Sequence, residues 1–535
     1  MKDLPDTSER RIAINTASRY VANAIGMLTS FILTPFLLSM IGPTLFGLKT
    51  LAGQALQFVG LASSAIGVSY NRYAATYYAR KDYDAMNAVL SAGLLLSVIS
   101  GGLFAVGTVI VTVYADTFFG LPPEIVGVAR IVILITGLST TFYILSGVWK
   151  APVFIRQRFY LMAGAEVFST VGAAVAVWLA FKYHSPSIIV WVLLDCGFRV
   201  GAEGLLLIPL CRRALPQMKV TFRHVAAGVR LREMIGFGSL TFIGQLGFLL
   251  YYATDSIIIS NLRELGPPRI AYYNIAQRWD PLLHMVIVSF TSALTPLLTA
   301  DFAVGNKLRL MNTLCRGTRY SLLVALYPCV LLVVFAAPFL HNWVGVDFAE
   351  VSGGVMQVIM AAFIVNVPSI MGYEFLIASG RLGKAVTALI VGGFVNIPLC
   401  VLLVKFAHLG LLGIALGSLI PLTLVNGLYV PALVSRDVGL PIRRYLSQGY
   451  ARACLAAVPL IAAAVALRWF WEARNLFVVL AQFAACGLVY AASVWTLGLD
   501  KDDRTKIASA LASVRGSILP RGGLGGPGAP SDGNP

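Results

Sequence analysis

Four basic residues lie inside long apolar stretches of the sequence, where a charged side chain is costly. They are Arg19, Lys49, Arg130 and Arg278. A charge at the centre of a membrane-spanning helix costs roughly 2.5–3.5 kcal/mol even on the lenient insertion scale. Such a residue therefore faces a water-filled cavity, pairs with an acid or extends to the interface. Arginine binds phosphate oxygens through two parallel hydrogen bonds and keeps its charge when buried, so a cavity lined by these residues favours an anionic ligand.

Three acidic residues in comparable positions provide a second kind of chemistry. Asp255, Asp280 and Glu166 also lie within apolar stretches. A carboxylate at membrane depth is able to exchange a proton or to hold a cation. These residues are candidates for ion coupling, and they are equally candidates for structural pairing with the basic residues.

Other charges at membrane depth have structural explanations. Asp195, Arg199 and Glu203 are spaced at i, i+4 and i+8, and this spacing predicts an ion ladder along one helix face. Long side chains near helix ends extend to the interface. That explanation applies to three residues near predicted helix ends: Arg72, Arg452 and Glu374.

The composition shows that most of these side chains are positioned by elements that lie in lipid. The chain has 535 residues, of which 58% are hydrophobic and 12% charged, and its mean hydropathy is +0.80. Soluble proteins carry about 25% charged residues. Half of that supply does not cover a water-facing surface of this size, so we predict an all-α integral membrane protein.

Fourteen apolar segments are long enough to cross a membrane, since a spanning helix needs about 20 mostly apolar residues. The predicted spans are 12–41, 46–79, 87–115, 123–148, 157–181, 186–211, 233–261, 268–300, 312–340, 349–379, 382–404, 409–434, 446–468 and 475–498.

The distribution of basic residues supports this count. With the N-terminus in the cytoplasm, the inside segments hold 28 Lys and Arg and the outside segments hold 6. Cytoplasmic loops of membrane proteins carry an excess of Lys and Arg. One missed or invented span would scramble the alternation downstream of it. We therefore predict a multi-pass protein with both termini in the cytoplasm.

An internal repeat organises the spans. Gly42-Pro43 follows the first span and Gly266-Pro267 follows the seventh, at an offset of 224 residues. Met86-Asn87 recurs as Met311-Asn312 at an offset of 225. Six spans per half make the halves parallel, an arrangement that builds a central cavity in transporters. The predicted parts are a first six-helix bundle (1–211), a basic cytoplasmic linker (212–232), a second six-helix bundle (233–434), two extra helices (435–499) and a partly disordered cytoplasmic tail (500–535).

Several kinds of site have no support in the sequence. The seven cysteines form no Cys-x-x-Cys pair and the five histidines are scattered, so we expect no metal site and no cofactor. The net charge of +17 is explained by basic loops, and no aromatic and basic interleaving points to nucleic acid.

Two stretches resemble bacterial polysaccharide-export flippases of the multidrug/oligosaccharidyl-lipid/polysaccharide exporter superfamily. In residues 37–91 the matching features are Gly42-Pro43, Phe46-Gly47, Arg72-Tyr73 and a short basic turn. Residues 253–283 are similar to the family's seventh and eighth spans, where Asp255 precedes an apolar run. The family's usual glycine in the following element is Ala271 in this chain.

The resemblance implies two six-helix bundles around a central cavity and a location in the bacterial inner (plasma) membrane. It implies that the chain is not an enzyme but translocates an undecaprenyl-diphosphate-linked oligosaccharide between leaflets by alternating access. The diphosphate would bind to Arg19 and Arg278, with Lys49 or Arg130. Membrane lipids are expected partners, as are a polysaccharide polymerase and export machinery.

Two other hypotheses about the function stay open. A drug or cation antiporter of the same superfamily would use Asp255, Asp280 and Glu166 to hold a cation or exchange a proton. A membrane polymerase or ligase generally needs a sizeable outside loop, and the outside segments here are short, with no paired carboxylates, His/Cys or Ser/His arrangement. A channel is less favoured, because no segment resembles a filter repeat.

Overall fold

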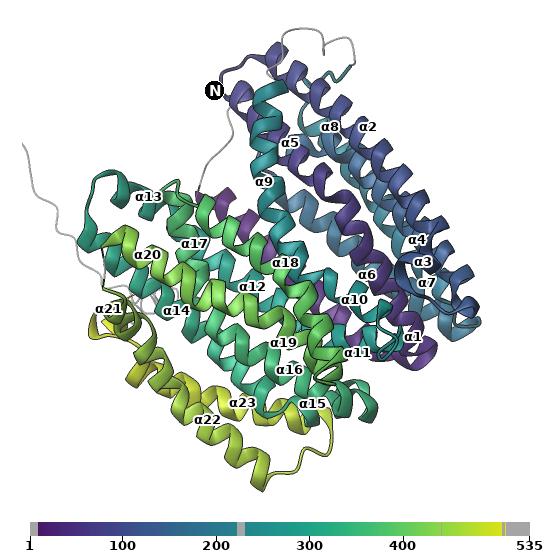
Figure 1. Ribbon diagram of the computed structural model, residues 1–535. Coiled ribbons are helices and arrows are strands. Elements are labelled where there is room, and N and C mark those ends of the chain that lie inside the picture. Colours follow the sequence, from purple (N-terminus) through teal and green to yellow (C-terminus); the bar gives the residue numbers. More distant parts are fainter. Residues whose placement is uncertain (1–8, 222–230, 440, 506–508, 510–535) are drawn as a thin grey trace, which may run out of the picture.

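In the computed structural model, residues 9–221, 231–439, 441–505 and 509 are described, and the elements of these ranges are helical (Figure 1). The prediction of a disordered tail and much of the predicted basic linker fall on residues outside these ranges. The all-α membrane fold with two parallel bundles is confirmed.

The first two predicted spans are two helices that meet at a sharp kink with no loop between them, and both carry the label α1. Helix α1 (Glu9–Ala79) runs through both spans and is broken at Gly42, whose φ of 74° and ψ of 167° lie outside the helical region. Pro43 follows directly. Glycine accepts a positive φ without a steric penalty, and proline is tolerated at the start of a helical segment because its missing N–H would have no partner there. The expected turn is thus a sharp break within α1.

The first bundle follows α1 with short connections. Its remaining elements are α2 (Tyr83–Val113), α3 (Ala115–Phe119), α4 (Pro123–Ser146), η1 (Gly147–Lys150), α5 (Ala151–Ile155), α6 (Phe159–Tyr183), α7 (Ile188–Gly201), the π-helical η2 (Ala202–Leu207) and α8 (Ile208–Ala214).

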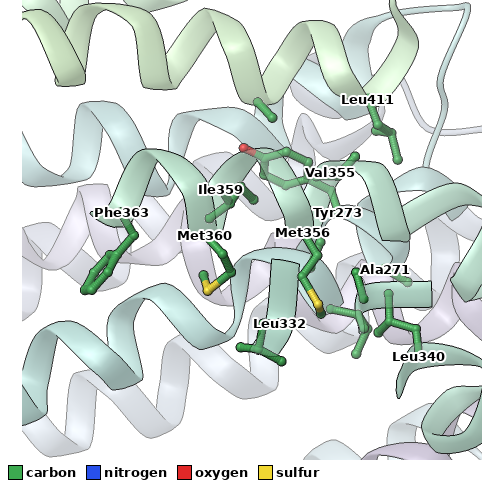
Figure 2. Packing of buried hydrophobic residues seen from close by; sticks show 14 of the residues in the cluster. Ala271, Tyr273, Leu332, Leu340, Val355, Met356, Ile359, Met360, Phe363 and Leu411 are labelled. Carbon is green, nitrogen blue, oxygen red and sulfur yellow. The ribbon is translucent and has the colours of Figure 1, made fainter. Parts of the chain in front are cut away.

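The second bundle contains more breaks within its spans. Its elements are α9 (Leu231–Tyr252), α10 (Thr254–Asn261), α11 (Pro268–Gln277), α12 (Trp279–Thr291), η4 (Ser292–Leu294), α13 (Thr295–Ala303), α14 (Lys307–Val334), α15 (Ala336–Val344), α16 (Val346–Asn366), α17 (Pro368–Ala378), α18 (Gly383–Lys405), α19 (Gly410–Thr423), the π-helical η5 (Leu424–Tyr429) and α20 (Val430–Val438). A buried cluster holds it together: Figure 2 shows Met356, Ile359, Met360 and Phe363 of α16 among side chains of α11, α14, α15 and α19.

Twelve helices in the described part of the chain are long and apolar enough to cross a membrane. Two differences separate this number from the predicted fourteen. Residues 14–61 count as one helix although α1 breaks at Gly42, and the segment from α7 to α8 is not among the twelve. The count of fourteen stays a prediction.

The backbone reproduces the predicted repeat. Gly42 and Gly266 have φ angles of 74° and 73°, and Lys81 and Gly305, also 224 positions apart, have φ angles of 60° and 73°. The next residues, Asp82 and Asn306, each accept a hydrogen bond from the backbone N–H three positions on and so cap α2 and α14. Both halves also carry a π-helical segment at a corresponding place, η2 and η5. The halves therefore share turn geometry and not only hydrophobicity.

The two bundles meet at the side opposite the start of α1, called here the far side. A Cβ at Gly47 would lie 3.0 Å from the Pro267 carbonyl oxygen and 3.1 Å from the Ala271 nitrogen. Gly47 and Ala271 are equivalent under the 224-residue offset, so the pseudo-symmetric positions pack on each other. Asn261 also donates a hydrogen bond of 2.8 Å to the Phe118 carbonyl across the bundles. Figure 1 shows the bundles converging near α10 and α11 and diverging toward α5 and α13.

The two extra helices, α22 (Arg452–Phe470) and α23 (Leu476–Ser493), follow α21 (Ile442–Leu446) and the π-helical η6 (Ser447–Ala451) and precede η7 (Val494–Gly498). They pack on the outside of the second bundle (Figure 1). Arg319 of α14 is 3% exposed and pairs with Asp500 at 2.8 Å and Asp503 at 2.7 Å. A buried arginine between two carboxylates is compensated, so this cluster anchors the chain after α23 to α14.

The second bundle supplies a hydrogen bond that α1 loses at Pro35. Pro35 has no N–H, so the Phe31 carbonyl four residues earlier loses its helical partner. The indole N–H of Trp343 in α15 donates to that carbonyl at 3.0 Å, and the two rings stack with centroids 5.0 Å apart. The hydrogen bond thus replaces the one that proline removes.

This arrangement predicts a coupled pair of substitutions. Trp343→Phe keeps an aromatic ring but leaves the Phe31 carbonyl without a donor, so we expect about 1–2 kcal/mol of destabilisation. In a Pro35→Ala background the new backbone N–H at position 35 donates to the Phe31 carbonyl. Trp343→Phe is therefore expected to lower the stability much less in that background. Thermal unfolding of the four proteins of this double-mutant cycle measures the difference. Trp495→Phe, at an exposed indole, is the control. Equal losses in both backgrounds would show that the stabilisation does not come from this hydrogen bond.

Candidate functional site

A large cavity lies between the bundles. Its volume is about 1680 Å³, and it is lined mainly by α1, α4, α6 and α7 of the first bundle and by α9, α11 and α12 of the second. Sites for drug-sized ligands are usually about 300–1,000 Å³, so this cavity accepts something larger. The wall is largely apolar, and hydroxyl and amide side chains are distributed over it, among them Thr29, Ser30, Gln54, Gln57, Asn71, Thr136, Ser139, Thr140, Ser169, Thr170, Gln245, Asn274 and Gln277.

The charges of the cavity wall are strongly unequal. Five basic residues line it and only one acidic residue, Asp195, among the described residues. The continuous helical run of α1 from Lys49 to Arg72 is 23 residues, which is about 35 Å at 1.5 Å per residue. Cationic groups therefore occur along most of the membrane depth. The five are Lys49, Arg72, Lys150, Arg199 and Arg278.

Arg278 lies where the bundles meet, as the sequence predicted for a cavity residue. It follows α11, precedes α12 and donates a hydrogen bond of 3.1 Å to the Thr34 hydroxyl of α1. One turn earlier, Asn274 accepts a hydrogen bond of 3.0 Å from Gln54 of α1. Gln54 is the residue equivalent to Arg278 under the repeat, so the second half carries a charge where the first half carries an amide.

Lys49 also lines the cavity, but its charge is compensated. Its ammonium lies 3.1 Å from the Asp195 carboxylate and 4.6 Å from the centre of the Trp191 ring. Asp195 therefore pairs with α1 and not with Arg199 on its own helix. The predicted ladder of Asp195, Arg199 and Glu203 is not formed, because the two carboxylates pair with different elements.

Lys150 is a cavity residue that the sequence analysis missed. It pairs with Glu203 of η2, and the Ser146 hydroxyl donates to the same carboxylate at 2.8 Å. Both charged side chains are less than 8% exposed. Its ammonium also lies 3.4 Å from the centre of the Tyr143 ring. Lys150 appeared to belong to a polar loop, and no spacing in the sequence relates it to an acid 53 positions away.

Arg19 and Glu166 are exposed and are not part of the cavity wall proper. Arg19 is seven residues before Gly26 and eleven before Ser30, both of which line the cavity, so it lies on the same face of α1. Glu166 is three and four residues before Ser169 and Thr170 on the lining face of α6. A hydrogen bond of 2.6 Å from Asn15 to the Gln157 carbonyl joins the starts of the two helices. Arg19 and Glu166 therefore continue the cavity faces toward the side where α1 begins.

Arg130 lies away from the cavity. It donates to the Val113 carbonyl at 2.9 Å and lies 3.4 Å from the Asp116 carboxylate, and about half of each charged side chain is exposed. Residues 136, 139, 140 and 143 of α4 line the cavity. At 100° per residue they project from a different side of the helix than Arg130. Its depth suggested a binding residue, but its helix face places it at the periphery.

Asp255 and Asp280 are buried behind the cavity wall in the second bundle, 0% and 4% exposed. Asp255 accepts hydrogen bonds from Tyr273 at 2.5 Å and Ser418 at 2.6 Å, and Asp280 accepts one from Tyr252 at 3.1 Å. Neither forms an ion pair within the described ranges. Tyr252 itself lines the cavity, so one hydroxyl connects the cavity wall to a buried carboxylate.

Comparisons with known proteins agree with this architecture. Residues 241–402 match the MatE family model. An uncharacterized membrane protein, EpsK of Bacillus subtilis (strain 168), is 24% identical over 513 residues, which cover 95% of this chain and 99% of EpsK.

Two solved structures share the fold. A lipid II flippase, MurJ, in an inward closed conformation superposes with a TM-score of 0.66 at 14% identity, covering 90% of this chain and 98% of MurJ. A multidrug resistance MATE family transporter of the MOP superfamily, in an inward-facing conformation, gives a TM-score of 0.65 at 14% identity, covering 79% and 99%. A MatE segment in the second bundle, twelve helices apolar enough to cross a membrane and a fold shared along nearly all of MurJ show that this chain is a multi-pass membrane protein with the fold of these solved structures.

Proposed function

We propose that this chain is a flippase that carries a lipid-linked oligosaccharide, attached through a diphosphate to undecaprenol, across the bacterial inner membrane for polysaccharide biosynthesis. The observation that carries the proposal is the charge of the cavity, where five basic side chains stand against one acidic one. Arginine and lysine in a site shielded from water favour a ligand with several negative charges, and a diphosphate supplies them.

The size and polarity of the cavity support a sugar-bearing substrate. A volume of about 1680 Å³ exceeds what a drug-sized molecule needs. The hydroxyl and amide groups of the wall are suited to hydrogen bonds with sugar hydroxyls. The apolar undecaprenyl chain stays in the bilayer, where it loses no favourable contact.

The contacts between the bundles support loading from one leaflet. They close the far side at Gly47 and at Asn261, while Arg19 and Glu166 continue the cavity faces toward the start of α1. The excess of basic residues in the segments on that side supports a cytoplasmic location for it. In this proposal both termini are cytoplasmic, and the substrate enters from the inner leaflet. A rocking motion of the bundles then exposes it outside, where a polymerase and export machinery are the expected partners.

Ion coupling is assigned in this proposal to the buried acids of the second bundle. A carboxylate with no cationic partner at 0% exposure, as at Asp255, is costly when ionised. Uptake of a proton or cation removes that cost. Asp280, which is linked to the cavity through Tyr252, is the second candidate for ion coupling. Glu166 is the third, and it lies where the cavity face of α6 continues toward the start of α1.

The same acids favour a second candidate function, a cation-coupled drug antiporter of the same superfamily. An antiporter would bind an organic cation in the cavity. The basic cavity wall opposes this, because like charges disfavour a cationic ligand. The two functions separate in a single transport experiment.

Arg278 is expected to be needed for transfer. In liposomes containing the purified chain, we measure inner-to-outer transfer of a fluorescent undecaprenyl-diphosphate oligosaccharide. Arg278→Gln removes a charge-assisted bond, which is usually worth about 1.5–3 kcal/mol, so the apparent affinity should fall about 10- to 100-fold. Arg19→Gln should lower it less, because Arg19 is exposed. Arg130→Gln, at the periphery, is the matched control and should transfer like the wild type.

Three other results are informative. Transfer by the wild type with no change in Arg278→Gln would refute the site. Equal losses in Arg130→Gln and Arg278→Gln would point to general damage. Efflux of a cationic dye, with no transfer of the lipid, would favour the antiporter.

Asp255→Asn is expected to uncouple transfer from its driving gradient. The amide cannot exchange a proton or neutralise a cation, so imposing a proton or sodium gradient should no longer accelerate transfer. Binding of the lipid should persist, because Asp255 does not line the cavity. Asp347→Asn, at an exposed carboxylate, is the control. A full gradient response in Asp255→Asn would remove this residue from the coupling role.

A further inference from the structure

Four of the five cationic residues of the cavity fall into two classes. Lys49 and Lys150 each pair with a carboxylate, Asp195 and Glu203 respectively. Arg199 and Arg278 line the same cavity and form no ion pair among the described residues. The lysines are thus neutralised within the protein, whereas these arginines keep charge available for a ligand.

The two lysine pairs differ in their access to solvent. The side chains of Lys150 and Glu203 are 7% and 6% exposed, and the Ser146 hydroxyl also donates to Glu203. Breaking such a buried pair leaves an uncompensated charge and is strongly unfavourable. The side chains of Lys49 and Asp195 are 29% and 37% exposed. Only this pair is open to exchange with a ligand from the cavity.

We propose that Asp195 competes with the substrate's phosphate for Lys49 and thereby weakens substrate binding. The inference rests on the proposed function and adds a positioning residue to it. An arriving phosphate takes the place of the carboxylate at the Lys49 ammonium, whose position is set by the Trp191 ring 4.6 Å away. The ligand must displace an existing interaction, so the net gain from binding Lys49 is smaller than for a free lysine.

The displaced carboxylate has a second cationic partner. Asp195 and Arg199 are separated by one helical turn on α7, and both line the cavity. Residues at i and i+4 lie on the same helix face and form ion pairs readily. Asp195 can therefore exchange Lys49 of α1 for Arg199 of its own helix without being left unpaired. The exchange replaces a contact between two helices by a contact within one.

This competition has a use in transport. A carrier must bind its substrate firmly enough to load it and weakly enough to release it. A cavity with five basic residues and no competitor would hold a diphosphate strongly. Asp195, the single acidic side chain of the described wall, reduces this attraction next to the far side, where release takes place in the proposed cycle.

The test measures binding and transport by the full chain. Binding of undecaprenyl diphosphate is measured in phosphatidylcholine nanodiscs, and half-saturation and maximal rate of oligosaccharide transfer in liposomes. Asp195→Asn should bind the lipid more tightly by up to about fivefold, the upper end of the range for a partly exposed ion pair, and its half-saturating concentration should fall. Its maximal rate should not rise. Asp195→Glu should restore wild-type affinity, and Arg199→Gln should weaken binding.

The Lys49→Met background tests whether the tighter binding depends on Lys49. The tighter binding should disappear in Lys49→Met/Asp195→Asn, which should match Lys49→Met alone. Unchanged or weaker binding by Asp195→Asn would overturn the inference, and so would a gain that survives without Lys49. A structural defect would not tighten binding. Failure of the wild type and every variant to bind the lipid would instead overturn the proposed function, and this inference with it.

Discussion

The cost of a charge in a low-dielectric, water-poor environment governs the placement of every ionisable side chain at membrane depth. Basic side chains at this depth in the described ranges are paired with acids, face the cavity or occupy a partly exposed position. Arg319 is buried between two carboxylates, Lys150 is buried against one, and Arg278 faces the cavity with a hydroxyl partner. Arg130 shows the remaining solution, a half-exposed position next to an acid. The cavity exists because charges that are not paired need polar surroundings.

The two halves share a pseudo-symmetric backbone, and they differ in the charged residues that line the cavity or lie buried behind it. The turns at Gly42 and Gly266 have nearly the same φ, and Gly47 packs on its own counterpart Ala271. Close approach at that point requires glycine at position 47, where a Cβ would meet the backbone of the second half. One residue pair shows the divergence: Lys150 of the first half corresponds to Glu374 of the second, which accepts a hydrogen bond from Thr295. Four of the five cavity cations lie in the first bundle, whereas the buried Asp255 and Asp280 lie in the second, so the two kinds of charge are largely divided between the bundles.

The sequence was sufficient for features that depend on composition or local spacing. Hydrophobic segments, the 224-residue repeat and the depth of Arg278 follow from one-dimensional patterns. The helix face on which a residue lies was harder to predict. Arg130 has the right depth but projects away from the cavity. Its position relative to residue 136 becomes informative only once the residues of α4 that line the cavity are known. Partners distant in sequence could not be predicted. Asp195 is 146 positions from Lys49, and the local alternative four residues away at Arg199 was the more economical choice.

The closed far side and the cavity are connected through α1. Thr34, which accepts the hydrogen bond of Arg278, directly precedes Pro35, and the Phe31 carbonyl freed by that proline accepts from Trp343. Two residues of the second bundle thus hold α1 within about one turn of Pro35. Both bonds cross between the bundles, so opening the far side by separating the bundles must stretch or break them. A ligand that competes for the guanidinium of Arg278 acts on the first bond. In the proposed cycle, substrate binding and the release of the contacts between the bundles therefore share Arg278, which is the physical condition for linking occupancy to opening.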